Sequence, residues 1–167
     1  AVFWQTARTR KQARPAVAVP RARAHGLRDM VITVDSHERY AWTFSDQQAS
    51  TRKAPLTACD YGVFDGDRLV AAVERKSLPD LASSLTTGRL KFAMGDLASL
   101  PHAAVVVEAR WSEVFKLTSV RPSVVAEAVA EYAVRWPSVP IHFAEPRKLA
   151  QEWAFRFLGA ALAEHHV

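Results

Sequence analysis

The stretch VAAVERKSLPDLASSL, residues 70–85, decides the fold expected for this chain. Its first part is a run of small apolar residues typical of a buried strand, and it ends on the charged triplet Glu74-Arg75-Lys76. Ser77 is a suitable N-cap and Pro79 fits a first helical turn, so a helix is predicted to follow at once. Most charged triplets only solvate a surface. This one joins a buried strand directly to a helix, which raises the question of what its charges do.

The preceding residues predict a hairpin. Leu56 to Phe64 and Leu69 to Lys76 form its two arms, and Asp65-Gly66-Asp67-Arg68 supplies the turn. If the turn is centred near Asp67, Asp60 lies opposite Glu74, with their Cβ atoms about 5 Å apart. A register slip or a bulge would shift this pairing by one residue.

Side chains alternate along a strand, so Glu74 and Lys76 share one face and Arg75 points to the other. Two facing carboxylates repel unless a cation joins them, and Mg²⁺ binds one or two carboxylates together with water and phosphate. Lys76 is then placed to hold an attacking water and to offset charge on a phosphodiester. Asp35, at the end of a predicted strand over residues 30–34, adds a third acid, and Glu38 is a candidate fourth. This arrangement favours phosphodiester hydrolysis.

The rest of the chain predicts alternating helices and strands. After a break at Thr86-Thr87-Gly88 we expect a second helix carrying Leu90, Ala93, Leu97 and Leu100. A strand is expected over 103–108, a helix over 122–136, a short strand over 139–143 and a closing helix over 146–163. Such alternation predicts an α/β architecture with a mixed central sheet flanked by helices.

Charge is concentrated at the N-terminus. The net charge is +5, yet residues 1–28 hold seven basic residues and no acid, which leaves 15 basic against 17 acidic residues in the remainder. We therefore divide the chain into a basic arm (1–28) and one domain (29–167). The arm is either a DNA-binding segment or a tail kept basic for solubility. Its candidate DNA contacts are Arg8, Arg10, Lys11, Arg14, Arg21 and Arg23.

Composition excludes several classes of protein. No apolar run is long enough to cross a membrane and no signal peptide is evident, so a cytoplasmic, nucleoid-associated location is expected. Cys59 is the single cysteine, so an internal disulfide is excluded, and the spacing of the histidines does not suggest a zinc site.

Several motifs together resemble one known family. They are Val34-Asp35-Ser36-His37-Glu38, Asp60-Tyr61, the segment from Val73 to Leu81, and Gly88-Arg89-Leu90. In that order they resemble the nuclease domain of the XPF-type structure-specific endonucleases, the excision-repair cross-complementing group 4 domain. The resemblance runs from about Met30 to Ala163.

The resemblance implies a restriction-endonuclease-like fold and Mg²⁺- or Mn²⁺-dependent cleavage of branched, flapped or junction-containing DNA. It implies that Asp60 and Glu74 are metal ligands, joined by the Arg75 backbone carbonyl, and that Lys76 is the catalytic lysine. Asp35 would be a further acid, Asp80 a supporting residue, and Arg89 would lie near the scissile phosphate or brace its helix. Because such nucleases work as dimers, a homodimer is also expected.

Two positions depart from the family pattern. Cys59 stands where the family usually has Gly, which puts in question any backbone conformation that only Gly adopts. His37 stands where an Arg is common, which weakens the local positive charge. No helix-hairpin-helix DNA-binding motif is found in the sequence.

Two alternative functions remain open. One is a catalytically silent module of nuclease fold that binds DNA or a dimer partner, although such modules typically lose the acids or the lysine. The other is a small-molecule phosphodiesterase, which the basic arm disfavours.

Aromatic residues in the second half of the chain are expected in the core. We expect Trp111 and Phe115 to be buried rather than to stack on bases. A stripe of Leu149, Trp153, Phe157 and Ala160 is expected to pack the last helix, with a dimer interface as the alternative.

Overall fold

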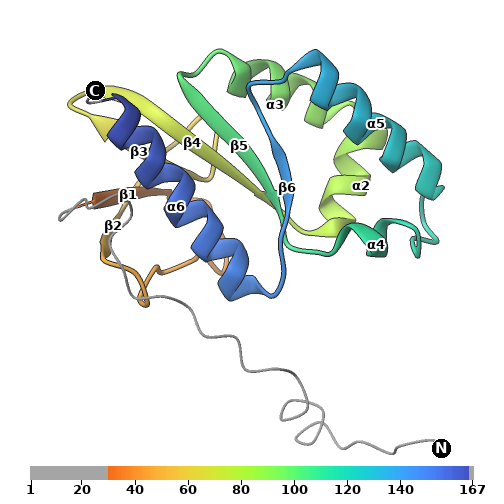
Figure 1. Cartoon of the computed structure of the whole chain (residues 1–167), viewed down its shortest axis with the longest axis horizontal. Helices are drawn as coiled ribbons and strands as arrows, with labels where there is room; N and C mark the ends of the chain where they lie inside the picture. The colour runs from red at the N-terminus through yellow and green to blue at the C-terminus, as the bar shows by residue number, and fades with distance from the viewer. Residues whose placement is uncertain (1–29, 166–167) are drawn as a thin grey trace, which may run out of the picture.

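The computed structural model describes residues 30–165, which form one mixed sheet with helices on both faces (Figure 1). The six strands lie in the order β2-β1-β3-β4-β5-β6. Their bounds are β1 Met30–Asp35, β2 Ala49–Ala54, β3 Tyr61–Asp65, β4 Arg68–Lys76, β5 His102–Val107 and β6 Ile141–Phe143. The helices are α2 Leu78–Thr86, α3 Arg89–Ala98, α4 Trp111–Val114, α5 Pro122–Arg135 and α6 Arg147–His165. The predicted arm and its candidate DNA contacts lie outside the described residues.

Strand directions bring several strand ends to one edge of the sheet. β4, β5 and β6 run parallel to one another, whereas β3 is antiparallel to both β1 and β4. The C-terminal ends of β1, β4, β5 and β6 therefore meet at the edge where β3 begins. Every acid and lysine proposed above for the site lies at or beside this edge.

The hairpin of β3 and β4 contains an irregularity that sets its register. The turn is short, with Asp65 paired to Arg68, and Gly66 takes a left-handed φ of 61° that favours glycine. A bulge follows between Val63 and Phe64, so that Val63 pairs with Ala71 and Tyr61 with Val73. Bulges of this kind re-aim the side chains beyond them.

Successive side chains of β4 point to opposite faces of the sheet and so pack into two separate cores. Ala71 and Val73 face a cluster that includes Ala154, Phe155 and Leu158 of α6. Ala72, between them, faces the opposite cluster, to which the helices α2, α3 and α5 contribute. The sheet is thus covered by α6 on one face and by α2, α3 and α5 on the other (Figure 1). Burial on both faces explains why the strand is apolar up to Glu74.

The helix that follows β4 begins as its sequence predicts. Ser77 is the N-cap, and its hydroxyl accepts a hydrogen bond from the backbone N–H of Asp80 at 3.2 Å. α2 ends before Gly88, whose φ of 78° suits glycine, and α3 starts at Arg89. This sharp start of α2 fixes the direction of the chain immediately after Lys76.

Most predicted elements are confirmed, and two were missed. β2 was not predicted because its sequence, ASTRKA, has no apolar alternation. Within residues 30–165 it is an edge strand paired with β1 alone, and four of its six residues are exposed. The four-residue helix α4 is too short to have a periodic signal. The first arm of the hairpin is also shorter than predicted, because β3 begins only at Tyr61.

One expectation about the core is wrong, and a second is confirmed only in part, because Trp153 and Phe157 pack against the core but are not fully buried. Trp111 and Phe115 are 42% and 55% exposed. On α6, the buried face is formed by a different set of residues, Ala150, Gln151, Ala154, Phe155, Leu158, Gly159 and Ala161. Small residues in this set let the helix approach the sheet closely, and the predicted stripe with Trp153 and Phe157 is left half-buried beside it.

Candidate active site

Three neighbouring strands carry the three predicted acids side by side. Asp35 is the last residue of β1, Asp60 directly precedes β3, and Glu74 lies near the end of β4. The backbone N–H of Asp35 donates to the carbonyl of Asp60 at 2.8 Å, and the N–H of Asp60 donates to the carbonyl of Val73 at 3.1 Å. These bonds bring the three acids to one edge of the sheet.

Asp60 and Glu74 form the centre of the site. The register of Tyr61 with Val73, continued by one residue, sets Asp60 opposite Glu74, as the hairpin predicted. Asp60 Oδ2 also accepts a hydrogen bond from the backbone N–H of Arg75 at 2.8 Å. Burial, the charge of Asp60 and a hydrogen bond between the two side chains raise the pKa of Glu74 to about 8. Burial likewise raises the pKa of Asp60, so the two carboxyls hold a proton between them near neutral pH.

Lys76 lies on the same face as Glu74. Its Nζ is 3.7 Å from Glu74 Oε1, and the two side chains are 22% and 16% exposed. The ammonium is therefore beside the carboxylate pair and still open to a ligand. A cation in this position stabilises negative charge that develops on a substrate next to the acids.

Asp35 and Glu38 flank this pair. Asp35 Oδ1 accepts a hydrogen bond from the backbone N–H of Leu56 at 2.9 Å, and His37 Nδ1 is 3.7 Å away. Burial raises the pKa of Glu38, and the charge of Asp60 raises it further. Glu38 Oε2 is buried and has no hydrogen-bond partner among residues 30–165. Buried polar atoms in proteins are usually hydrogen-bonded, so this oxygen can accept a hydrogen bond from a bound group.

The oxygen atoms of this site fit a hard divalent cation. Within residues 30–165, no three His, Cys, Asp or Glu side chains form a ready-made metal cluster. Mg²⁺ and Mn²⁺ need fewer protein ligands than that, because water and substrate phosphate complete their coordination. Asp60 and Glu74 share a proton that a cation would displace, and Glu38 Oε2 has no partner within the described part of the chain. The residues present therefore suit Mg²⁺ or Mn²⁺ better than zinc.

The Arg75 side chain points away from this site and has a structural role that the sequence did not reveal. Its Nε donates to Glu108 Oε1 at 2.7 Å, and the same oxygen accepts from Trp42 Nε1 at 2.8 Å. The guanidinium also donates to the carbonyl of Tyr40 at 3.0 Å and lies over the Trp42 ring. Arg147 contacts both Glu108 and the Tyr40 carbonyl. Arg75 and Glu108 therefore pin the loop after β1 that carries Glu38.

Glu108, Trp42 and Tyr61 were missed as residues that support the site. The Trp42 ring stacks on Tyr61 with centroids 4.7 Å apart, and the Tyr61 hydroxyl accepts a hydrogen bond from the Trp42 backbone N–H at 2.8 Å. A signal for Glu108 was present, because it ends an apolar strand just as Glu74 does. Trp42 gave no signal, since it lies in a loop without periodicity.

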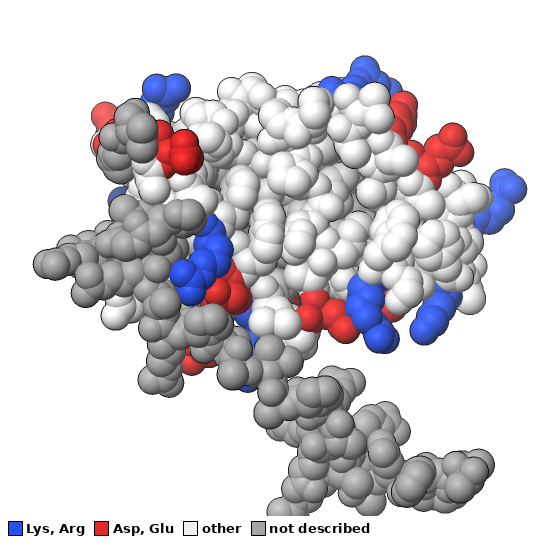
Figure 2. Space-filling view, viewed as in Figure 1, with Lys and Arg blue, Asp and Glu red and all other residues white. Residues whose placement is uncertain are grey.

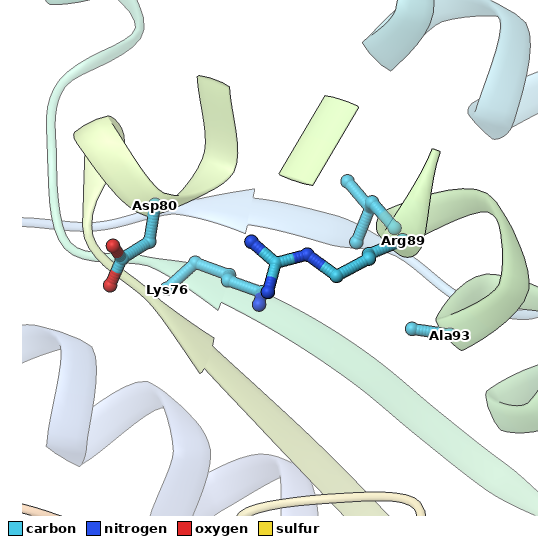
Figure 3. A pocket seen from close by; sticks show the side chains of 5 residues that line it. Lys76, Asp80, Arg89 and Ala93 are labelled. Atoms are coloured by element: carbon cyan, nitrogen blue, oxygen red, sulfur yellow. The ribbon is translucent and has the colours of Figure 1, made fainter. Parts of the chain in front are cut away.

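A cationic pocket adjoins Lys76 on the α2 and α3 side. Figure 3 shows Lys76 from β4 and Arg89 from α3 reaching into the same hollow. It has a volume of about 370 Å³ and is also lined by Asp80, Leu90 and Ala93. Two cationic side chains against one carboxylate give the pocket a positive balance, which suits a phosphate group.

The two departures from the family pattern cause no strain. Cys59 is 5% exposed in the core under α2 and α3, and burial raises its pKa to about 12, so the thiol stays protonated. Tyr40 and Phe44 are the non-glycine residues with positive φ in the described part of the chain, so Cys59 adopts ordinary backbone geometry. His37 is exposed and lies beside Asp35.

Comparison with known proteins identifies the family and the fold of this chain. A family model described as "ERCC4 domain" matches residues 8–157. The structure of XPF from Aeropyrum pernix superimposes with a TM-score of 0.64 at 20% identity, over 78% of this chain and 60% of that chain. The structure of XPF from Aeropyrum pernix in complex with DNA gives 0.62 at 22% identity, over 81% of this chain and 66% of that one. No curated protein matches by sequence.

These comparisons confirm the expected fold and family. The mixed six-stranded sheet with flanking helices is the restriction-endonuclease-like fold that the sequence predicted. This chain spans about 60% of the length of the first XPF chain that it matches. Among residues 30–165, no helix is both long and apolar enough to cross a bilayer. The family model covers most of the sequence, and the chain belongs to the ERCC4 domain family.

Proposed function

We propose that this protein is a divalent-metal-dependent endonuclease that hydrolyses phosphodiester bonds in branched, flapped or junction-containing DNA. The observation that carries this proposal is the pairing of Asp60 with Glu74, with Lys76 3.7 Å from Glu74 on the same face. Membership of the ERCC4 domain family supports it, as does the existence of a DNA complex of a protein with this fold.

Each residue has a distinct role in this proposal. Asp60, Glu74 and the Arg75 backbone carbonyl would hold Mg²⁺ or Mn²⁺, which when bound polarises the phosphate and stabilises negative charge. Lys76 orients the attacking water and offsets charge on the phosphate that it attacks. Glu38 and Asp35 are the further acids beside the metal ligands. The buried Oε2 of Glu38 is available to accept a hydrogen bond from the attacking water.

Phosphate binding is assigned to the cationic pocket. Arg89 and Lys76 reach into it from different elements, so one phosphate there would touch both (Figure 3). Asp80 supports this arrangement from the first turn of α2. Longer-range attraction to DNA is assigned to the basic arm and to its residues Arg8, Arg10, Lys11, Arg14, Arg21 and Arg23. With DNA as its substrate, the protein would act at the nucleoid.

A homodimer is the oligomeric state that we propose. Figure 2 shows few charged side chains over the centre of the face formed by α6, β6 and α5. There His142 stacks on Trp153 at 4.3 Å and Trp153 stacks on Phe157 at 5.2 Å, and all three side chains are half-buried. A second copy would cover this aromatic stripe.

The test is cleavage of end-labelled flap, fork and plain duplex DNA with Mg²⁺ or Mn²⁺. The wild-type protein should cut near the junction of the branched substrates, and chelation of the metal should stop it. Glu74→Gln keeps the shape of the side chain and should lose cleavage. If the wild-type protein binds the flap and cuts nothing with either metal, the alternative of a silent DNA-binding or partner module replaces this proposal.

A further inference from the structure

Two exposed aromatic rings lie at the same sheet edge as the candidate active site. Trp111 and Phe115 are 42% and 55% exposed, and their ring centroids are 5.5 Å apart. Trp111 also contacts Phe143 at the end of β6, with centroids 5.2 Å apart. Single exposed apolar residues are ordinary, whereas a contiguous exposed aromatic pair marks a contact surface.

The local fold holds both rings outward. Val114 of α4 is fully buried and anchors this single turn of helix in the core. Trp111 and Phe115, four residues apart, share a side of the turn that Val114 does not occupy. Their planes, and those of Trp111 and Phe143, are close to perpendicular, at 85° and 77°. An edge-to-face contact uses the face of only one ring in each pair, so ring surface remains for a ligand.

The surface lies close to the site of chemistry. Glu108 directly follows β5, and its backbone N–H donates to the carbonyl of Lys76 at 2.9 Å. Trp111 is three residues further along, and three residues span at most about 11 Å. The span from Glu108 to Trp111 is therefore about three base steps of a DNA strand at 3.4 Å each. A strand bound at Lys76 can therefore pass over Trp111.

The charges around the rings favour an anionic ligand. Residues 110–126 contain the three basic residues Arg110, Lys116 and Arg121 and the single acid Glu113, and Lys116 and Arg121 are exposed. Arg110, next to Trp111, is 58% exposed and is shared between Glu113 at 3.5 Å and Glu145 at 3.3 Å. Aromatic faces bordered by basic residues are how proteins bind single-stranded nucleic acid. Two rings also form too small a patch to hold a protein partner by themselves.

We propose that Trp111 and Phe115 form a stacking platform for unpaired bases in the single-stranded arm of a branched DNA substrate. This inference rests on the proposed function, because it takes DNA as the ligand. It adds a reason for preferring branched substrates, since bases in an intact duplex are stacked on one another and cannot reach the rings.

The test is equilibrium binding of the full chain, in EDTA, to a flap whose single-stranded arm has about 16 nucleotides. A second flap carries abasic sites in that arm, which keeps the phosphates and removes the bases, and a third probe is the plain duplex. The wild-type protein should bind the normal flap on the order of tenfold more tightly than the abasic flap. Equal affinity for the two flaps would overturn the proposal without the use of any variant.

Variants locate the contact. Trp111→Ala and Phe115→Ala should each weaken binding of the normal flap severalfold, leave duplex binding unchanged and reduce the preference for bases over abasic sites. Trp111→Phe should retain most of that preference. Val134→Ala, on α5, removes a side chain that is 84% exposed elsewhere and should change nothing. An equal loss of flap and duplex binding, or dissociation of a dimer in sedimentation with flap binding unchanged, would overturn the assignment.

Failure of the platform and failure of the nuclease proposal can be told apart. Binding is measured without metal, so it does not depend on cleavage. A wild-type protein that prefers the normal flap yet never cuts it would contradict the nuclease proposal alone. One that cuts the flap while binding normal and abasic arms equally would contradict the platform alone.

Discussion

Glu74 holds a proton that an isolated glutamate would release. Its pKa is raised to about 8 from an ordinary value of 4.5, first by burial and then by the charge of Asp60. Between pH 4.5 and about pH 8, the folded protein therefore binds more protons than the unfolded chain. The free energy of unfolding of the metal-free protein should therefore fall as the pH rises from about 4.5 to about 8.

Glu74→Gln should remove this dependence. Glutamine resembles the protonated acid, so the variant should be more stable than the wild type at pH 8 without metal, by more than about 1 kcal/mol. Below pH 4.5 the two proteins should converge. Urea unfolding at several pH values tests this, with Glu127→Gln on the exposed side of α5 as the control. Adding Mg²⁺ should stabilise the wild type and leave Glu74→Gln unchanged; an equal response of both proteins would place the cation elsewhere.

The pairing of Asp60 with Glu74 could be predicted because two departures from the assumed hairpin, a shifted turn and a bulge, cancel each other. The prediction assumed a turn centred on Asp67, whereas Asp65 pairs with Arg68, so the turn is centred half a residue earlier. That register alone would set Asp60 opposite Val73. The bulge between Val63 and Phe64 adds one residue to β4 and restores the predicted pairing beyond it. The sequence carried no direct signal for this bulge.

Other elements show what the sequence could and could not predict. β4 and α2 were predictable because an apolar strand, an N-cap serine and a first-turn proline agree locally. β2 was not, since an edge strand exposed to water needs no apolar alternation. The contacts that hold the loop after β1 could not be predicted from the sequence either. Trp42 and Glu108 are 66 residues apart in sequence, and only the folded chain brings them together.

The loop after β1 depends on Glu108. This carboxylate binds Arg75 and Trp42 through one oxygen, and the side chains of Arg75 and Glu108 are only 15% and 18% exposed. Glu108→Ala leaves the Arg75 guanidinium with less compensation and should lower the free energy of unfolding by about 1–3 kcal/mol. Hydrogen exchange should rise in residues 36–48. An exchange pattern identical to that of the wild type would show that Arg75 and Glu108 do not hold the loop.

At the scale of the whole molecule, the basic arm should determine how DNA binding responds to salt. Deletion of residues 1–28 removes seven basic residues and should weaken DNA binding. It should also flatten the fall of affinity with salt concentration, because each lost phosphate contact lowers the logarithmic slope by about 0.9. The measurement is a salt titration of flap binding by both proteins. Equal slopes would make the arm a solubility tail.

The aromatic stripe on α6 should control oligomeric state. Phe157→Glu places a charge beside Trp153 on the uncharged face (Figure 2) and should shift a dimer to monomer in sedimentation equilibrium. Val31→Glu, at a position of β1 whose side chain is 45% exposed, serves as the control and should not. A wild-type protein that remains monomeric at every concentration would contradict the proposed dimer.

The central claim is that Lys76 and the Asp60–Glu74 pair perform hydrolysis on DNA whose affinity comes mostly from other parts of the protein. The most direct test compares Lys76→Ala with the wild type on one flap substrate, with cleavage measured in Mn²⁺ and binding measured in EDTA. The account predicts that the variant loses cleavage by a factor of at least about 100 and keeps wild-type affinity within a few-fold. Undiminished cleavage by Lys76→Ala would show that the chemistry takes place elsewhere and would contradict the account.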